Sequence, residues 1–90
     1  MNRIKVEKNP SQGRLSELKT DSWPTWTCKV SEFDWEYSEA EACYFFEGKV
    51  VVEAEGESVE IKKGDLAFFP QGLKCRWKVL EPVRKVYRLG

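Results

Sequence analysis

The fold class is decided by the stretch Lys74-Cys75-Arg76-Trp77-Lys78-Val79, in which every second residue is basic. Successive side chains of a β-strand point to opposite faces of the sheet, so a strand here separates two sets of residues. Cys75, Trp77 and Val79 are expected to face an apolar interior, while the three basic residues face water. The stretch therefore predicts a strand in a sheet that has one buried face.

Segments of similar length lie before and after this strand, and Gly or Pro separates them. Residues 58–62 alternate cleanly, and turns are expected at Gly56, at residues 63–65 and 70–72, and at Glu81-Pro82. The predicted strands are residues 3–8, 28–33, 42–46, 50–55, 58–62, 66–69, 74–79 and 83–89. Short strands at regular spacing with such turns are typical of an all-β sandwich or barrel.

One short helix is expected near the N-terminus. Ser11 is a suitable N-cap, and Leu15 and Leu18 share a helix face at i,i+3 spacing, while Gly13 limits the helix to one or two turns. A chain of this length forms one domain. We expect a single domain over residues 1–90, in which residues 1–24 form a strand and short helix packed on a barrel core of residues 25–90.

Composition argues against several classes of partner. The 90 residues include 15 basic and 15 acidic side chains and no histidine, so the formal net charge is zero. Neither a nucleic acid nor a membrane partner is expected, because no strong basic field and no apolar stretch of roughly 20 residues is present.

The three cysteines, Cys28, Cys43 and Cys75, lack CxxC spacing and no secretion signal is visible. They are expected to be reduced thiols in a cytoplasmic protein.

Two spaced motifs resemble those of the cupin family. Gly64, Pro70-Gln71-Gly72 and Cys75 have the spacing of the second cupin motif, whose last position is ordinarily a metal-binding histidine. Glu41 and Gly48 resemble the end of the first motif.

Counting back from Glu41 with the spacing of that first motif, Trp35 and Tyr37 occupy the positions of its two metal-binding histidines. By this resemblance the carboxylate position is retained as Glu41, while three histidine positions hold other residues.

Further matches follow in order along the chain, at residues 22–24, 30–33, 41–44, 47–50, 63–66 and 75–79. Together they are similar to the small single-domain cupins of domain-of-unknown-function group 861, the Cupin_3 group. That group is related to the cupin domains of ureidoglycine aminohydrolase and of ethanolamine utilisation. The resemblance implies an RmlC-like jelly-roll β-barrel with an open mouth and an interior site, and frequent dimers. It implies no particular substrate, because one fold hosts many functions.

The resemblance also implies a ligand pocket inside the barrel. Glu41, Cys43, Cys75 and Trp77 are expected to converge there, with Trp35 and Tyr37 near the mouth. A carboxylate among aromatic residues is costly to bury without a partner, which makes Glu41 the most informative residue. It would serve as general acid or base, metal ligand or substrate anchor, or it would have a purely structural partner.

Two further readings concern the thiols and the basic residues. Glu41, Cys43 and Cys75 could bind a soft divalent ion, or Cys75 could be a nucleophile, but no histidine is present as ligand or base. A divalent metal is therefore disfavoured, and no other cofactor is expected. The basic residues of the C-terminal strands are expected to form a solvated face; they are Lys74, Arg76, Lys78, Arg84, Lys85 and Arg88.

Two function classes remain open from the sequence. The first is a protein that binds a small polar nitrogenous or carbohydrate metabolite at a non-histidine site inside the barrel, with or without catalysis. The second is a non-catalytic scaffold or interaction module that uses the same fold.

Overall fold

The computed structural model describes residues 4–90, so Arg3, the first residue of the first predicted strand, lies outside the described part. Seven strands, one α-helix and one 3-10 helix are present in residues 4–90. They are β1 (Lys5–Lys8), α1 (Gln12–Leu18), η1 (Thr20–Ser22), β2 (Thr25–Cys28), β3 (Ser31–Glu36), β4 (Glu41–Ala54), β5 (Glu57–Lys62), β6 (Asp65–Phe69) and β7 (Lys74–Leu89).

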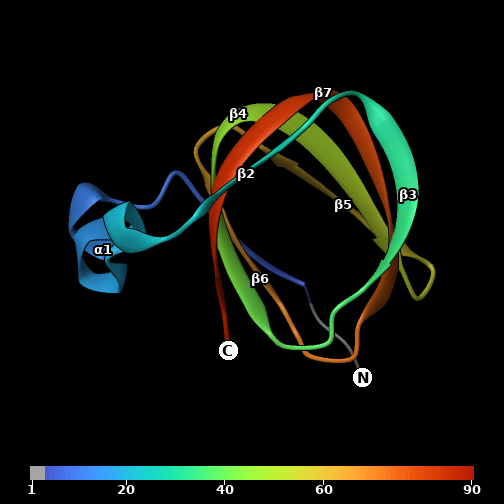
Figure 1. Cartoon of the computed structure of the whole chain (residues 1–90), viewed down its shortest axis with the longest axis horizontal. Helices are drawn as coiled ribbons and strands as arrows, with labels where there is room; N and C mark the ends of the chain where they lie inside the picture. The colour runs from blue at the N-terminus through green and yellow to red at the C-terminus, as the bar shows by residue number, and fades with distance from the viewer. Residues whose placement is uncertain (1–3) are drawn as a thin grey trace.

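The two long strands, β4 and β7, form the centre of the fold. They pair antiparallel from Glu41 opposite Leu89 to Glu53 opposite Arg76. At one end β6 lies beside β4, β1 lies beside β6, and β2 lies beside β7. At the other end β5 lies beside β4, and β3 lies beside β7. Because β4 and β7 bend between these ends, the two groups of strands face each other as layers (Figure 1). The expected all-β jelly roll with a short N-terminal helix is confirmed.

The bend is built where Gly48 of β4 meets Pro82 of β7. Gly48 has a φ of +98°, and a Cβ at this position would lie 2.3 Å from the Pro82 carbonyl oxygen, so only glycine fits. The pairing register shifts between Phe45 and Val50. As a result the β4 residues that face the main core change from odd positions before the bend, such as Phe45, to even positions after it, such as Val52.

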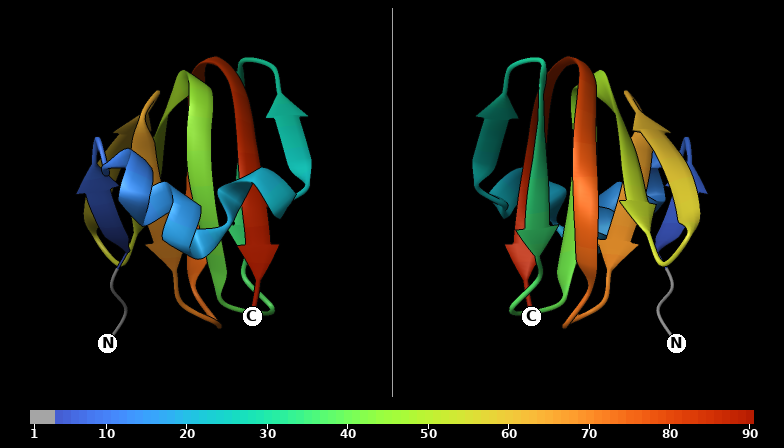
Figure 2. Two further views of the ribbon diagram at one scale, coloured as in Figure 1. Left: turned by 90° about the vertical axis from the view of Figure 1, so that its left-hand side faces the viewer. Right: turned by 90° about the vertical axis from the view of Figure 1, so that its right-hand side faces the viewer.

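The hydrogen-bonded sheet of residues 4–90 is not closed, so the expected β-barrel is open along one side. Within residues 4–90, β2 and β3 both pair with β7 and not with each other. Their partners are residues 83–86 and 74–79, which lie on opposite sides of the β7 bend. The bend therefore carries β2 and β3 into different layers, and they diverge from the turn that joins them (Figure 2).

That turn corrects a second prediction, a single strand over residues 28–33. The structure ends β2 at Cys28 and begins β3 at Ser31. The Ser31 hydroxyl donates a hydrogen bond of 2.8 Å to the Lys29 carbonyl, and the Cys28 thiol donates to the same oxygen.

A third correction concerns Glu81-Pro82, which lies inside continuous β7 and not in a turn between two strands. A proline is tolerated there because the ladder is irregular at the bend.

The N-terminal segment covers the outer face of the β6–β4–β7 layer (Figure 2). Ser11 caps α1 as predicted, since its Oγ accepts a hydrogen bond of 3.1 Å from the Arg14 amide. Trp23 then packs on a small cluster with Ala42, Leu66 and Val86. This layer is therefore buried on both faces. No helix in the described part of the chain is long and apolar enough to cross a membrane.

Candidate functional site

The interior contains a cavity of about 270 Å³ on the side where β2 and β3 diverge. Six aromatic side chains form most of its wall, and it holds one carboxylate and one ammonium group. The lining residues are Trp26, Phe33, Trp35, Tyr37, Glu41, Trp77, Lys85, Tyr87 and Leu89. An apolar cavity with a few polar groups inside is the usual form of a small-molecule site.

The aromatic wall is held in place by contacts between rings from four strands and from Tyr37. Phe33 of β3 lies opposite Trp77 of β7 and stacks on it, with centroids 6.0 Å apart and planes 17° apart. Trp26 of β2 meets the same indole edge to face at 5.9 Å. Tyr37, which follows β3, stacks on Phe69 at 4.7 Å. Trp35 is 51% exposed, so it stands at the rim of the cavity.

Glu41 and Lys85 form an ion pair in this aromatic surrounding. Lys85 Nζ donates to Glu41 Oε2 at 2.9 Å, and the two side chains are only 6% and 10% exposed. Removing both charges from water costs several kcal/mol per ion, an order-of-magnitude cost that close pairing offsets. Each charge is therefore tolerated in the interior only because the opposite charge lies beside it.

Three aromatic rings also surround the Lys85 ammonium. Its Nζ lies 4.6 Å from the ring centroid of Trp77, 4.9 Å from that of Trp26 and 5.8 Å from that of Phe45. The negative faces of such rings attract a cation within about 6 Å. The cavity therefore contains an ammonium group and a carboxylate side by side, and aromatic rings surround the ammonium.

Sequence reasoning missed Lys85, which it had assigned to the solvated basic face. Arg84 and Arg88 do lie on the outer face, where their guanidinium groups pack over Phe46 and Trp23. Lys85 shares strand parity with Val83 and Tyr87, and this is the signal that could have placed it inside. The signal was weak because Val86, on the opposite face, is apolar as well and is buried beneath the N-terminal segment.

Four of the six predicted pocket residues line the cavity: Trp35, Tyr37, Glu41 and Trp77. Cys43 and Cys75 do not line it. Cys43 is completely buried behind the wall, whereas Cys75 borders a different hollow and donates from Sγ to the Trp35 carbonyl at 3.6 Å. Cys43 nevertheless lies close enough to Glu41 and Lys85 for both charges to act on its pKa, whereas Glu41 has no such influence on Cys75.

The protonation of the buried phenol and thiols follows from their surroundings. Burial raises the pKa of Tyr37 far above its usual value, and the negative charge of Glu41 raises it further. Burial also raises the pKa of Cys43 to about 12 and that of Cys75 to about 11. All three groups are neutral at pH 7, so Tyr37 offers a phenolic hydroxyl to the cavity and Cys75 is a thiol in place of a thiolate nucleophile.

The indole N–H of Trp77 lies near both Tyr37 and Cys75 and lowers the pKa of each. It is completely buried and makes no hydrogen bond of good geometry within residues 4–90. A buried donor without an acceptor costs roughly 1–3 kcal/mol. The unpaired N–H belongs to a residue that lines the cavity, and residues of binding sites are often not optimised for the stability of the fold alone.

These residues do not fit the metal ion of the histidine-containing cupins. Within residues 4–90, no group of three His, Cys, Asp or Glu side chains is placed to hold an ion. The carboxylate of Glu41 is instead paired with the ammonium of Lys85.

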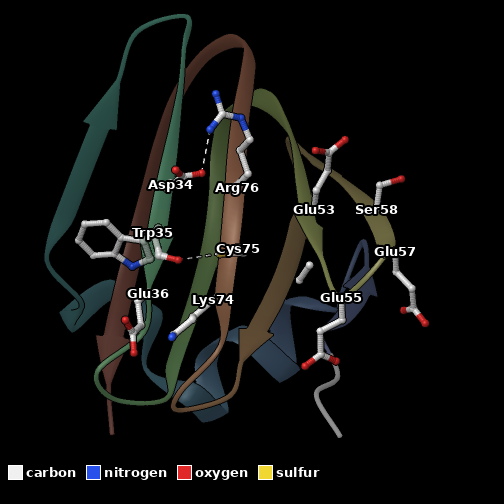
Figure 3. A pocket seen from close by; sticks show the side chains of 12 residues that line it. Asp34, Trp35, Glu36, Glu53, Glu55, Glu57, Ser58, Lys74, Cys75 and Arg76 are labelled. Atoms are coloured by element: carbon white, nitrogen blue, oxygen red, sulfur yellow. Dashed lines mark hydrogen bonds and ion pairs between the residues drawn. The ribbon is translucent and has the colours of Figure 1, made fainter.

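A larger hollow of about 900 Å³ lies outside the cavity, between β3, the start of β7 and the β4–β5 turn (Figure 3). Five carboxylates and two basic side chains line it, but it is an open groove and several of its charges already have partners. Arg76 pairs with Asp34 at 2.8 Å, as Figure 3 shows, and Glu53 pairs with Lys78 at 3.0 Å. Size alone does not make it a site, because its walls neither enclose nor desolvate a ligand.

Comparison with protein families gives one match, and it covers most of the chain. The EutQ-like cupin domain family matches residues 15–87. The chain belongs to the EutQ-like cupin family. The resemblance inferred from the motifs at Glu41–Gly48 and Gly64–Cys75 is thereby confirmed.

Solved structures place this cupin within the family. A DUF861 family protein from Thermotoga maritima is 54% identical, with a TM-score of 0.94, and the alignment covers 98% of this chain and 100% of that one. A DUF861 protein of unknown function from Pseudomonas syringae is 31% identical with a TM-score of 0.67, over 73% of this chain and 29% of that one. The EutQ protein of Clostridium difficile is 23% identical with a TM-score of 0.69, over 98% of this chain and 68% of that one, and shows the shared fold alone. A comparison with curated proteins gives no match.

Proposed function

We propose that this cupin binds a small polar molecule in the aromatic cavity, with Glu41 and Lys85 as its polar anchor. The observation that carries the proposal is that a buried ion pair borders an otherwise apolar cavity of about 270 Å³. Drug-sized and smaller ligands bind in such cavities, where a few polar groups fix their orientation.

A purely structural role accounts less well for this pair. Replacing a buried ion pair by apolar residues of similar volume is often neutral or stabilising. A chain that needed only a packed interior would gain nothing from a lysine and a glutamate beside an open cavity. Binding gives the two charges a use, since a ligand satisfies the hydrogen-bonding capacity that the pair leaves free.

Thermal unfolding in the presence of a panel of neutral, anionic and cationic metabolites tests the proposal. The proteins are the wild type, the double variant Glu41→Leu/Lys85→Met, and the control Glu53→Leu/Lys78→Met, which removes an ion pair of similar length from the surface. A ligand present at about 100 times its Kd stabilises the folded state by about 2.7 kcal/mol. We expect at least one compound to raise the Tm of the wild type and of the surface control, but not of the cavity variant.

If no compound raises the Tm, or if the rise is the same in the cavity variant, the cavity is not the binding site. The chain would then be better described as a scaffold that uses the cupin fold without an interior ligand.

A further inference from the structure

We infer that the ligand of this cavity is an uncharged planar nitrogen heterocycle that carries a ring N–H next to a carbonyl group. The inference rests on the proposed function and adds the chemical class of the ligand. It follows from the charge of the cavity, from its free hydrogen-bonding groups and from the shape of its walls.

Charge argues for a neutral ligand. Glu41 and Lys85 are the only charged residues that line the cavity within the described part of the chain, and their charges cancel. An anion bound here meets the Glu41 carboxylate, and a cation meets the Lys85 ammonium, in surroundings where water screens poorly. A neutral ligand with a strong local dipole avoids both repulsions and gains from both charges.

Hydrogen-bonding capacity argues for a donor and an acceptor side by side. An ammonium group has three N–H donors, and the recorded bond of Lys85 to Glu41 uses one. Glu41 accepts that bond through Oε2, and within residues 4–90 its Oε1 accepts none. A carbonyl oxygen fits beside Lys85 and a ring N–H beside the free Oε1 of Glu41, because the 2.9 Å bond from Lys85 Nζ to Glu41 Oε2 holds the two groups side by side. Neighbouring C=O and N–H groups of a cyclic amide have this arrangement.

The walls argue for a flat ring. Phe33 and Trp77, which stack on each other, line the cavity together with Trp26, Trp35, Tyr37 and Tyr87, so the lining is mainly aromatic. Flat rings stack or meet edge to face on such surfaces, and each aromatic pair adds about 0.5–1.5 kcal/mol beyond the area buried. A sugar ring offers hydroxyl groups to these walls, which have few partners for them.

Calorimetric titration with five small compounds tests the inference. Uracil and 2-pyridone carry the ring N–H beside a carbonyl, 1,3-dimethyluracil keeps the ring and both carbonyls without an N–H, and benzoate and benzylammonium carry a charge on a flat ring. We expect uracil or 2-pyridone to bind the wild type, and the loss of the N–H in 1,3-dimethyluracil to weaken binding about tenfold or more. Glu41→Leu/Lys85→Met should lose this binding, while Glu53→Leu/Lys78→Met should retain it.

Three results overturn the inference, and they differ in whether the proposed function survives. Binding of benzoate or benzylammonium in preference to the cyclic amides, sensitive to the Glu41→Leu/Lys85→Met change, rejects the ligand class and leaves the proposed function standing. Equal binding of uracil and 1,3-dimethyluracil rejects the class in the same way. Absence of binding by every compound, together with a negative metabolite panel, rejects the proposed function as well.

Discussion

At the residue scale, Lys85 supplies the positive charge that the Glu41 carboxylate needs inside the protein. The motif comparison leaves Glu41 alone among Trp35, Tyr37 and Cys75, with no histidine near it. The structure shows that its partner comes from β7, at the position opposite Phe45 of β4, and that three aromatic rings surround the ammonium. The site is therefore built on an ion pair that no cupin motif contains.

The pair predicts a specific pattern of stability. Glu41→Leu or Lys85→Met alone leaves an unpaired buried charge and should destabilise the protein by about 3–5 kcal/mol. The double variant should lie within about 1 kcal/mol of the wild type, because an apolar pair replaces an ionic one. Urea unfolding of the four proteins measures this cycle. For the surface pair of Glu53 and Lys78, the corresponding single changes should cost only about 0–1 kcal/mol. If the losses from the two single changes at Glu41 and Lys85 simply add in the double variant, the two residues are not coupled.

The thiols give a prediction of pH dependence. Since the folded-state pKa values of Cys75 and Cys43 are raised from 9.0 to about 11 and about 12, the native protein holds more protons than the unfolded chain above pH 9. Their contribution to the free energy of unfolding is therefore full below pH 9 and is lost as the pH rises from 9 toward 12. The fall should be smaller in Cys75→Ser. Unfolding followed between pH 8 and pH 11 measures it, and a stability that rises over this range contradicts the raised values.

Accessibility of the same thiols is a separate prediction. Cys28 is partly exposed at the end of β2, whereas Cys43 and Cys75 are buried. A maleimide reagent at pH 7.5 should therefore modify one thiol quickly in the native protein and all three in denaturant. Mass spectrometry of the modified peptides identifies the fast residue, and rapid labelling of Cys43 would contradict the packing described.

At the element scale, the close contact between Gly48 and Pro82 sets the shape of both long strands. Gly48→Ala places a Cβ against the Pro82 carbonyl and requires an unfavourable φ, so a loss of about 3 kcal/mol or more is expected. Gly56 is the matched control, because its φ is also positive but no atom lies within 4 Å of a Cβ built there. Gly56→Ala should cost about 1 kcal/mol. Chemical denaturation compares the two, and equal losses would show that the contact at the bend has no importance of its own.

How far the sequence predicts these elements depends on whether local pattern or long-range pairing decides them. The alternation in residues 74–79 correctly placed Cys75, Trp77 and Val79 inside, because one face of that strand is buried and the other is solvated. The same reasoning failed for Lys85, where the N-terminal segment buries the outer face and both faces carry apolar residues.

The turn at Lys29 and Val30 was missed because its hydrogen bonds come from Cys28 and Ser31 and not from Gly or Pro. In the candidate site, Glu41, Tyr37 and Trp77 were found by motif position, whereas Lys85 required the pairing of β4 with β7.

At the scale of the whole molecule, the open side of the sheet and the cavity belong together. β2 and β3 are edge strands held by β7 alone, whereas β4 and β7 are paired on both sides along much of their length. Side chains from both of these strands line the cavity, so a ligand there contacts strands that have one hydrogen-bonded neighbour each.

Hydrogen exchange should show this difference. Amides of β4 and β7 that pair with each other are expected to exchange slowest, and those of β2 and β3 considerably faster. A ligand in the cavity should slow exchange in β2 and β3 more than in β5 or β1, which do not line it. Mass spectrometry with and without a compound from the panel measures both effects, and protection confined to β5 would place the ligand in the outer groove instead.

The divergence of β2 and β3 has a consequence for the rate at which molecules enter. Many enclosed sites admit a ligand only after a lid or loop moves, which takes microseconds to milliseconds. Here the half-exposed side chain of Trp35, on β3, stands at the rim, and within residues 4–90 β3 shares no strand pairing with β2. Entry then requires a side-chain rotation in nanoseconds and no breakage of the sheet. Association should be limited by encounter in solution, so that ligands of different affinity differ mainly in how long they stay.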